Sequence, residues 1–389
     1  MLPTFYQTHL QKKLAQAEFL LLTILLNLRQ SEKQVRLERL VRVLPYPITT
    51  ESLAKQTTKI SGLTSINHRI NLVSLDRLLV NNLLLCGTNF INCDRSYVNG
   101  GVLISSREAK LSRRESPSIR ERRAIPLYWC VLPKLGNSNL SEQTLALQQV
   151  LPLLKEYKVI VLSDREFCSV DLGNWLKTRG VSFCLRLKKN HCVETENLIW
   201  QRLDQLGIVP GNSLYFRGVR SRKTRPVEGF DIACKWKRNY QGLKVKNAWF
   251  ILTDLGSLPV AIAAYQKRMG IEEMFRDCKT GGYNIEGTGL RGDRLIKMIL
   301  LMTIAYSSAI FQGTEIQKKQ VQKYVVRRRE PRKKYRRRST FGMGQDGEKW
   351  ANYLEQHCEA VQELMKLTPN KRRFYLQGIR AATLMISTL

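Results

Sequence analysis

The segment from Ala124 to Leu187 constrains the fold most, because short apolar stretches alternate in it with stretches of helical character. Strands are expected at residues 124–132, 158–163 and 182–187. Helices are expected at residues 141–157, capped by Ser141, and at residues 170–179. Strands that alternate with helices through short connections are typical of an α/β sheet. The sequence therefore predicts an α/β sheet.

The stretch from 188 to 250 has a different character, because strand candidates follow one another between turns that contain Gly and Pro. These candidates are residues 213–219, 230–237 and 243–253. The pattern predicts a β-rich insertion, after which helical character returns at Pro259 and continues to the end. The apolar run Leu295–Phe311 contains Lys297 and two serines, so we expect a buried core helix and no membrane segment.

The first fifty residues are rich in good helix formers. Helices are expected at residues 5–29 and 32–43, the second of them ended by Pro45. This region is either a small domain that docks on DNA or a helical cap on the core, and the sequence leaves both open. Residues 51–123 are the least regular, and 105–123 are expected to form a loop or insertion.

The predicted organisation has five parts. They are a helical, possible DNA-binding domain at 1–52, the first part of an α/β core at 53–187 (irregular over 53–122), a β-rich insertion at 188–256, the second part of the core at 257–312, and a basic helical C-terminal region at 313–389.

The charge balance indicates a polyanionic partner. Lys and Arg number 64 against 32 Asp and Glu, which leaves a formal charge of +32. Such an excess repels itself in a compact chain unless a polyanion screens it, and nucleic acid is the obvious one. Arg327–Arg338 is a nearly pure cationic run, which is either a solvated tail or a contact to the DNA backbone.

The cysteines indicate the compartment. The chain has nine of them, an odd number, with no Cys-x-x-Cys pair and no secretory signal at its start. We therefore expect a reduced, intracellular protein.

Asp164 is the first candidate for chemistry, because it directly follows the apolar strand 158–163. Open α/β sheets usually place ligand groups at the carboxyl ends of their strands. Two divalent ions held by converging carboxylates are well suited to cleave a phosphodiester bond. Alternatively, Asp164 caps the helix expected near residue 170.

Glu272 is the second candidate. On one continuous helix over 265–279, Tyr265, Arg268, Glu272 and Lys279 fall within a sector of roughly 60°, with Arg276 beside them. Ile271, Met274 and Cys278 form an apolar face on the opposite side. A carboxylate among cations keeps its charge, and the cations are placed to bind DNA phosphates. The alternative is an ordinary salt-bridged amphipathic helix.

The run Tyr265-x2-Arg268-x3-Glu272-x6-Lys279 resembles the Tyr-Arg-Glu-Lys signature of bacterial insertion-sequence DDE transposases. Asp164 within VIVLSDREF is similar to the second catalytic Asp of that family, and the β-rich stretch resembles the insertion that follows it. AIPLYW followed by LPKLGNSN also resembles the family's strand after its first Asp. The resemblance covers residues 124–310 well and the remainder less specifically.

This resemblance implies a ribonuclease H-like core, which is a mixed sheet flanked by helices. With two Mg²⁺ or Mn²⁺ ions, such a core would cleave DNA at insertion-sequence ends and transfer strands. Asp164 and Glu272 would be metal ligands, and Tyr265, Arg268, Arg276 and Lys279 would lie against DNA. Its partners would be double-stranded terminal repeats and target DNA, bound by a dimer, with no small-molecule substrate. The resemblance further implies a bacterial cytoplasmic protein that associates with the nucleoid when bound to DNA.

The family's first Asp is expected as Asp-Arg-Thr at the end of the first core strand. Asp94-Arg95-Ser96 is the nearest match, with 88–93 as its strand and 101–105 as the next. Cys86-Gly87-Thr88-Asn89-Phe90 also resembles that strand, with Cys in the Asp place. A shifted reading frame over 53–120 would explain the departure, and it would leave a catalytically impaired remnant that only binds DNA. A basic RNA-associated structural protein is a third possibility, although it leaves the residues of the signature unexplained.

Overall fold

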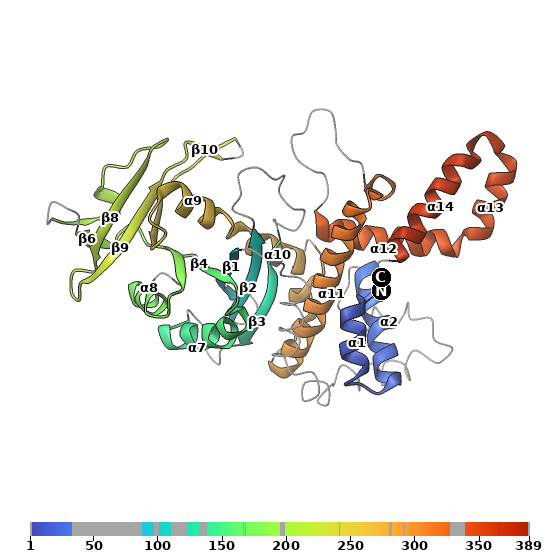
Figure 1. Cartoon of the computed structure of the whole chain (residues 1–389), viewed down its shortest axis with the longest axis horizontal. Coiled ribbons are helices and arrows are strands. Elements are labelled where there is room, and N and C mark those ends of the chain that lie inside the picture. Colours follow the sequence, from blue (N-terminus) through green and yellow to red (C-terminus); the bar gives the residue numbers. More distant parts are fainter. Residues whose placement is uncertain are drawn as a thin grey trace. The chain divides into compact units, whose positions relative to one another are not determined.

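The computed structural model describes residues 2–32, 88–96, 101–109, 123–131, 138–165, 167, 169–194, 199–240, 242–279, 282–290, 292–326 and 339–387 (Figure 1). The chain divides into two compact units. The sheet unit comprises Leu84–Glu273, and the helical unit comprises Met1–Leu83 with Met274–Leu389. The candidate segments 33–43 and 327–338, and Cys86, lie outside the described residues.

The described strands of the sheet unit form one ten-stranded sheet in the order β3-β2-β1-β4-β5-β12-β9-β8-β6-β7. Its strands are β1 (Thr88–Ser96), β2 (Gly101–Ala109), β3 (Ile125–Val131), β4 (Lys158–Ser163), β5 (Ser182–Arg186), β6 (Cys192–Glu194), β7 (Trp200–Arg202), β8 (Ser213–Ser221), β9 (Val227–Lys235) and β12 (Trp249–Thr253). A separate pair joins β10 (Asn239–Tyr240) to β11 (Leu243–Lys244). The predicted β-rich stretch thus continues the sheet, because β12 pairs with β5.

The strand directions make the sheet mixed, as the resemblance implies. β1, β2 and β3 are antiparallel neighbours, whereas β4 runs parallel to both β1 and β5. The central strand β4 is covered on both faces, and Ile160, Val161 and Leu162 are at most 1 % exposed. A strand buried on both faces has a continuous apolar run instead of an alternating one, which explains the sequence of β4.

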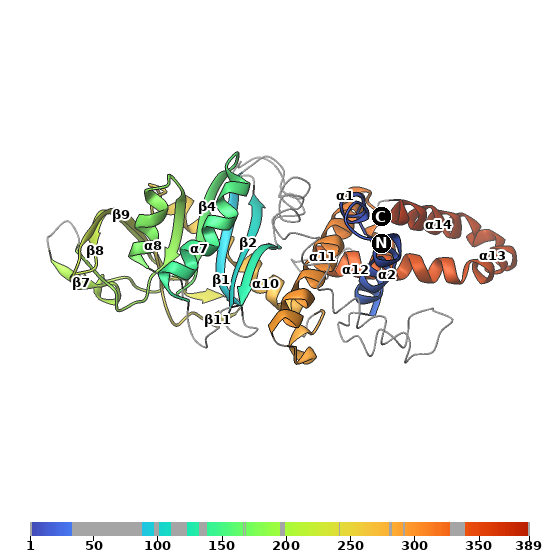
Figure 2. The ribbon, with the colours of Figure 1, turned by 90° about the horizontal axis from the view of Figure 1, so that it is seen from below.

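Helices cover both faces of the central strands. α9 (Leu258–Gln266) packs on Ile160, Leu162 and Cys184. On the other face lies α8 (Val170–Lys177), where a Cβ on Gly173 would be 3.2 Å from a methyl group of Leu252. α7 (Leu140–Val150) lies beside α8 in both views (Figures 1 and 2).

The helix boundaries in this unit differ from the predicted ones at two places. Asn139, and not Ser141, caps α7, because its side chain accepts the Glu142 N–H while Glu142 accepts the Asn139 N–H. α7 also ends at Val150 and not near Tyr157, since Pro152 falls in the 3-10 turn η1 (Leu151–Leu154) that follows. The remaining 3-10 turn of the unit is η2 (Leu203–Gln205).

The helical unit begins with two helices, α1 (Thr4–Gln11) and α2 (Gln16–Glu32), so the single helix expected at 5–29 is wrong. The break has a local cause, because the Glu18 carboxylate accepts the Ala15 N–H at 3.1 Å and so caps a new helix. The unit further contains α11 (Gly292–Lys318), α12 (Thr340–Gln356), α13 (Cys358–Leu367), α14 (Arg372–Ile386) and the 3-10 turns η3 (Ile285–Thr288), η4 (Gln322–Tyr324) and η5 (Pro369–Lys371).

α11 is the core helix of this unit, as its sequence predicts. Among the described residues, Arg294–Lys318 is the one helical stretch long and apolar enough to cross a membrane, and 89 % of its most apolar window is buried inside the protein. Two glycines bring α11 close to α12. A Cβ on Gly313 would overlap the Thr340 carbonyl oxygen, and one on Gly344 would overlap that of Ala309. The contact between these helices therefore depends on residues without side chains.

Candidate active site at the ends of strands β1 and β4

Two aspartates occupy matching backbone positions on neighbouring parallel strands. Cys93 of β1 pairs with Ser163 of β4, so Asp94 and Asp164 each follow one residue later. β1 continues to Ser96, and Asp94 therefore lies inside the strand and not at the end that the sequence suggests. The side chain of Asp94 is outside the described part of the structure. This register places both residues at the same level of the sheet.

The segment that carries the remaining candidates is not one helix. Tyr265 is in the last turn of α9, Arg268 lies in a break, and Glu272 is in α10 (Met269–Cys278). Across the break the N–H groups bond three residues back, from Arg268 to Tyr265 and from Ile271 to Arg268. The single helix expected over 265–279 is therefore wrong, and the sector worked out at 100° per residue does not apply across it. Gly270, a poor helix former, falls at this break.

The candidates nevertheless gather around one arginine. The Nη2 of Arg268 donates to the Oε1 of Glu272, and Arg268 is 7 % exposed while the Glu272 side chain is 45 % exposed. Tyr265 is buried and packs edge-on against Trp249, with ring centroids 5.3 Å apart. Burial raises the pKa of the Tyr265 hydroxyl. The nearby cations Arg268 and Arg186 lower this pKa, and the Asp164 carboxylate raises it. The Tyr265 hydroxyl thus lies within electrostatic reach of Asp164 and Arg268.

Arg186 belongs to this cluster, and the sequence reasoning missed it. Leu185 pairs with Ser163, so Arg186 at the end of β5 is level with Asp164. Burial lowers the pKa of the Arg186 guanidinium. Tyr265 raises this pKa, whereas the like charges of Arg165 and Arg268 lower it. A signal was present in the sequence, because a charged residue follows the buried Phe183–Leu185 run at the carboxyl end of a strand. We call Asp164, Arg186, Tyr265, Arg268 and Glu272 the strand-end cluster.

The faces of α10 agree with the sequence prediction. Ile271, Met274 and Cys278 are at most 5 % exposed. The helix is attached to the start of β3 by an ion pair of 2.8 Å between Arg123 and Glu273 and by the Ala124 N–H, which donates to Gly270.

The other two predicted DNA-binding residues lie beyond the boundary of the sheet unit. Arg276 is exposed on α10, and Lys279 is half-buried directly after it, with its N–H bonded to Phe275 at 2.9 Å. Both belong to the helical unit, so their roles remain predictions.

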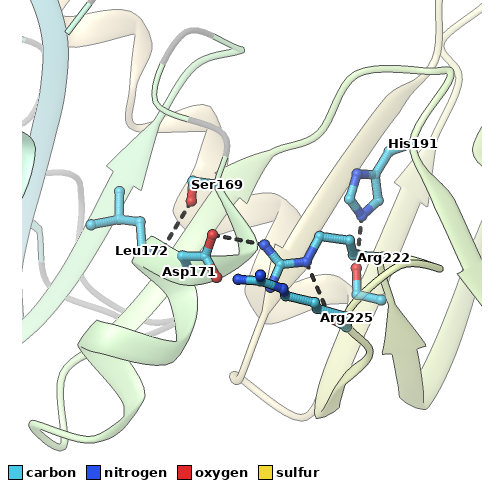
Figure 3. A network of polar contacts seen from close by, with 7 residues as sticks. Ser169, Asp171, Leu172, His191, Arg222 and Arg225 are labelled. Atoms are coloured by element: carbon cyan, nitrogen blue, oxygen red, sulfur yellow. Dashed lines mark hydrogen bonds and ion pairs between the residues drawn. The ribbon is translucent and has the colours of Figure 1, made fainter. Parts of the chain in front are cut away.

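The loop after Asp164 is held in place by its own hydrogen bonds. The Ser163 hydroxyl donates to the Phe167 carbonyl at 3.1 Å, and Ser169 caps α8 by accepting the Leu172 N–H at 3.2 Å. Asp171, in the first turn of α8, pairs with Arg222 at 2.8 Å (Figure 3). Since Ser169 is the cap of α8, the alternative in which Asp164 serves as that cap is wrong.

The same network contains a serine–histidine pair. Nε2 of His191 lies 2.8 Å from the Ser221 hydroxyl (Figure 3). Ser221 is fully buried, so no substrate reaches its oxygen, and the pair joins the start of β6 to the end of β8. Burial lowers the pKa of His191, and Arg222 lowers it further. This pair is therefore structural.

The donor atoms of the strand-end cluster fit a hard cation. Asp164 and Glu272 offer carboxylate oxygens, which Mg²⁺ and Mn²⁺ prefer. Asp164 and Arg268 both act on the Tyr265 hydroxyl, and Arg268 bonds to Glu272. Within the described residues, no three His, Cys, Asp or Glu side chains form a group that holds a metal by itself. The side chain of Asp94, the third predicted metal ligand, lies outside the described side chains.

Comparisons with known proteins agree with this arrangement. Residues 127–308, just under half of the chain, match the model of the transposase DDE domain family, and this range contains Asp164 and Glu272. No curated protein matches the chain. Among solved structures, a piggyBac transposase in a synaptic complex with hairpin DNA is similar over 98 % of this chain and 81 % of that chain, at 9 % identity and a TM-score of 0.44. A likeness of that size does not define a shared fold.

Proposed function

We propose that the chain is a DDE transposase that cleaves DNA at insertion-sequence ends and joins the freed strand to target DNA. The observation that carries this proposal is the match of residues 127–308 to the transposase DDE domain, because it covers both Asp164 and Glu272. The matching register of Asp94 and Asp164 supports it further. The order β3-β2-β1-β4-β5 with its directions supports a ribonuclease H-like core at this end of the sheet.

Asp94, Asp164 and Glu272 would hold two Mg²⁺ or Mn²⁺ ions. Such ions, when bound, activate a water or a 3′-hydroxyl and neutralise the leaving oxygen. The chain itself keeps the Glu272 carboxylate oriented through its bond to Arg268. The hydrogen bonds of the Ser163 and Ser169 hydroxyl groups hold the backbone on both sides of the turn that follows Asp164. Such rigidity is needed, because misplacement of a catalytic group by about 1 Å is costly.

The cations of the strand-end cluster would hold the DNA backbone beside the cleaved bond. Arg268 is buried and Arg186 is half-buried beside the Tyr265 hydroxyl, so their guanidinium groups lose few conformations when a phosphate binds. Arg276 and Lys279 would contact phosphates from the turn after Glu272. The partners would be terminal-repeat and target duplexes, bound by a dimer in the bacterial cytoplasm.

The experiment is a nicking assay on DNA that carries the terminal repeats flanking the encoding gene. The purified chain should nick that duplex only when Mg²⁺ or Mn²⁺ is present, and Asp164→Ala should abolish nicking. Specific binding without nicking would identify the DNA-binding remnant. Nicking that survives Asp164→Ala would contradict the assigned site. A preference for RNA without any metal response would contradict the proposed function itself.

A further inference from the structure

A second concave surface lies at the opposite end of β4 from Asp164. Lys158 begins β4, and Asp164 follows its last residue, so the two are about 20 Å apart along the strand. At the Lys158 end, η1, the end of α8 and the starts of β4 and β5 enclose a groove with a volume of about 570 Å³. We call it the amino-end groove. It is therefore separate from the strand-end cluster.

The side chains that line this groove carry charge of one sign. Lys155, Lys158 and Arg179 contribute three cations, and no Asp or Glu is among the lining residues. All three are exposed, and none of them forms an ion pair with a carboxylate elsewhere in the part of the chain that the structure describes. Basic side chains that no carboxylate neutralises create a local field that attracts anions.

One of these cations is held in a fixed place. The Arg179 guanidinium lies 4.0 Å from the centre of the Trp175 ring, and its Nη1 donates to the Trp175 carbonyl at 3.3 Å. Stacking on an aromatic ring holds the planar group so that its remaining N–H bonds point outward. Because the guanidinium covers this face of Trp175, an unpaired base has no room to stack there. The groove is thus better suited to phosphates than to bases.

We propose that the amino-end groove binds the sugar-phosphate backbone of a second stretch of duplex DNA, independent of its sequence. This inference rests on the proposed function, which supplies DNA as the partner. It adds a contact that the strand-end cluster does not make, because the two surfaces lie at opposite ends of β4. Lys155, Lys158 and Arg179 bind phosphates there.

The direct test is lysine labelling of the native chain, read by mass spectrometry. The full chain is acetylated with and without a 30-bp duplex of arbitrary sequence, in buffer without divalent metal so that no strand is cut. Labelling of Lys155 and Lys158 should fall several-fold with the duplex and return at about 0.5 M salt, where phosphate contacts weaken. Unchanged labelling while the duplex is bound would overturn the proposal, and so would protection by an RNA duplex alone. Neither result depends on cleavage, so failure of the nicking assay is distinguishable.

A matched pair of variants tests the energetics. The groove variant is Lys155→Gln/Lys158→Gln/Arg179→Gln. The control is Lys371→Gln/Arg372→Gln/Arg373→Gln, which removes the same charge from exposed positions of η5 and α14. In the groove variant, the slope of log affinity against log salt should become shallower by up to about 2.7, at about 0.9 for each phosphate contact. Equal changes of the slope in both variants would assign the effect to net charge and overturn the proposal that the groove binds DNA.

Discussion

The sheet unit and the helical unit both bury arginine side chains, but they surround those side chains differently. In the sheet unit, Arg268 bonds to Glu272, Arg123 pairs with Glu273 at 2.8 Å, and Arg186 lies beside Tyr265. In the helical unit, Arg29 of α2 is 1 % exposed, and no nitrogen of its guanidinium has a hydrogen-bond partner among the described residues. Burial lowers the pKa of Arg29 to about 10, and Tyr283 raises it.

The buried arginines of the sheet unit are placed to bind an anion, whereas the buried Arg29 of the helical unit lowers stability. A buried cation beside carboxylates and a phenol is held in one geometry and can bind an anion with little reorganisation. A buried cation without partners loses its hydration and gains nothing in return. The helical unit offsets this cost through close packing, as at Gly313 and Gly344.

The largest effect is expected at the carboxylates of the sheet unit. Alanine at Asp94, Asp164 or Glu272 removes several kcal/mol of transition-state stabilisation, which corresponds to a loss of nicking of about a thousandfold or more. Binding of the same duplex, measured by fluorescence anisotropy, should change by only a few-fold. Full activity in the Asp94 variant alone would mean that another residue is the first metal ligand.

Gly344→Ala tests the close contact between α11 and α12 in the helical unit. The added methyl group overlaps the Ala309 carbonyl oxygen, so we expect a loss of about 2–3 kcal/mol in the free energy of unfolding. Gly378→Ala on α14 is the matched control, because its Cβ would meet only a Tyr324 ring carbon at 3.9 Å. The control should be neutral or stabilising by up to about 1 kcal/mol. Urea unfolding measures both, and similar values for the two would show that α11 and α12 are not in close contact.

Replacing Arg29 and Arg123 by Met tests the comparison itself. Arg29→Met removes a buried charge that has no hydrogen-bond partner among the described residues, and it should stabilise the chain by about 1–4 kcal/mol. Arg123→Met removes the partner of Glu273 and should destabilise it by about 2 kcal/mol. Thermal unfolding provides the comparison. A loss of stability in both variants would mean that the two units bury arginine in the same way.

The smallest effect is expected from His191. Its pKa in the folded state lies below 6.5, the value expected in the unfolded chain, because burial and Arg222 disfavour the charged ring. Between these two pKa values the unfolded chain binds more protons, so stability should fall as the pH is lowered through 6.5. His191→Gln should flatten this part of the stability profile. A profile unchanged by that substitution would assign the pH dependence to other groups.

The sequence predicted the sheet better than the helices. β4 was located to the residue, since the four consecutive apolar residues Val159–Leu162 lie between Lys158 and the polar residues Ser163 and Asp164. The helix ends were predicted less well, because they depend on hydrogen bonds made by individual side chains. Glu18 starts a second helix where good helix formers continue without interruption, and Asn139 caps α7 two residues before the expected Ser141.

The composition of the candidate site stays a prediction, whereas the structure corrects the geometry expected for the segment around Arg268. Spacing alone placed Tyr265 and Glu272 on one helix, whereas the break at Arg268 brings them together across two. Arg186 was missed because its place beside Asp164 follows from the pairing of β4 with β5, which no local pattern shows. Strand register therefore determines which of the candidate residues lie at the same level of the sheet.

The most direct test of the central claim is a Mn²⁺ titration followed by electron paramagnetic resonance, which requires no knowledge of the terminal repeats. The native chain should bind Mn²⁺, and Asp164→Ala and Glu272→Ala should each weaken that binding strongly. Glu156→Ala is the control, because Glu156 is exposed just before β4 at the opposite end from Asp164, and this variant should bind as the native chain does. Unchanged Mn²⁺ binding in both the Asp164 and Glu272 variants would contradict a shared metal site at the strand-end cluster.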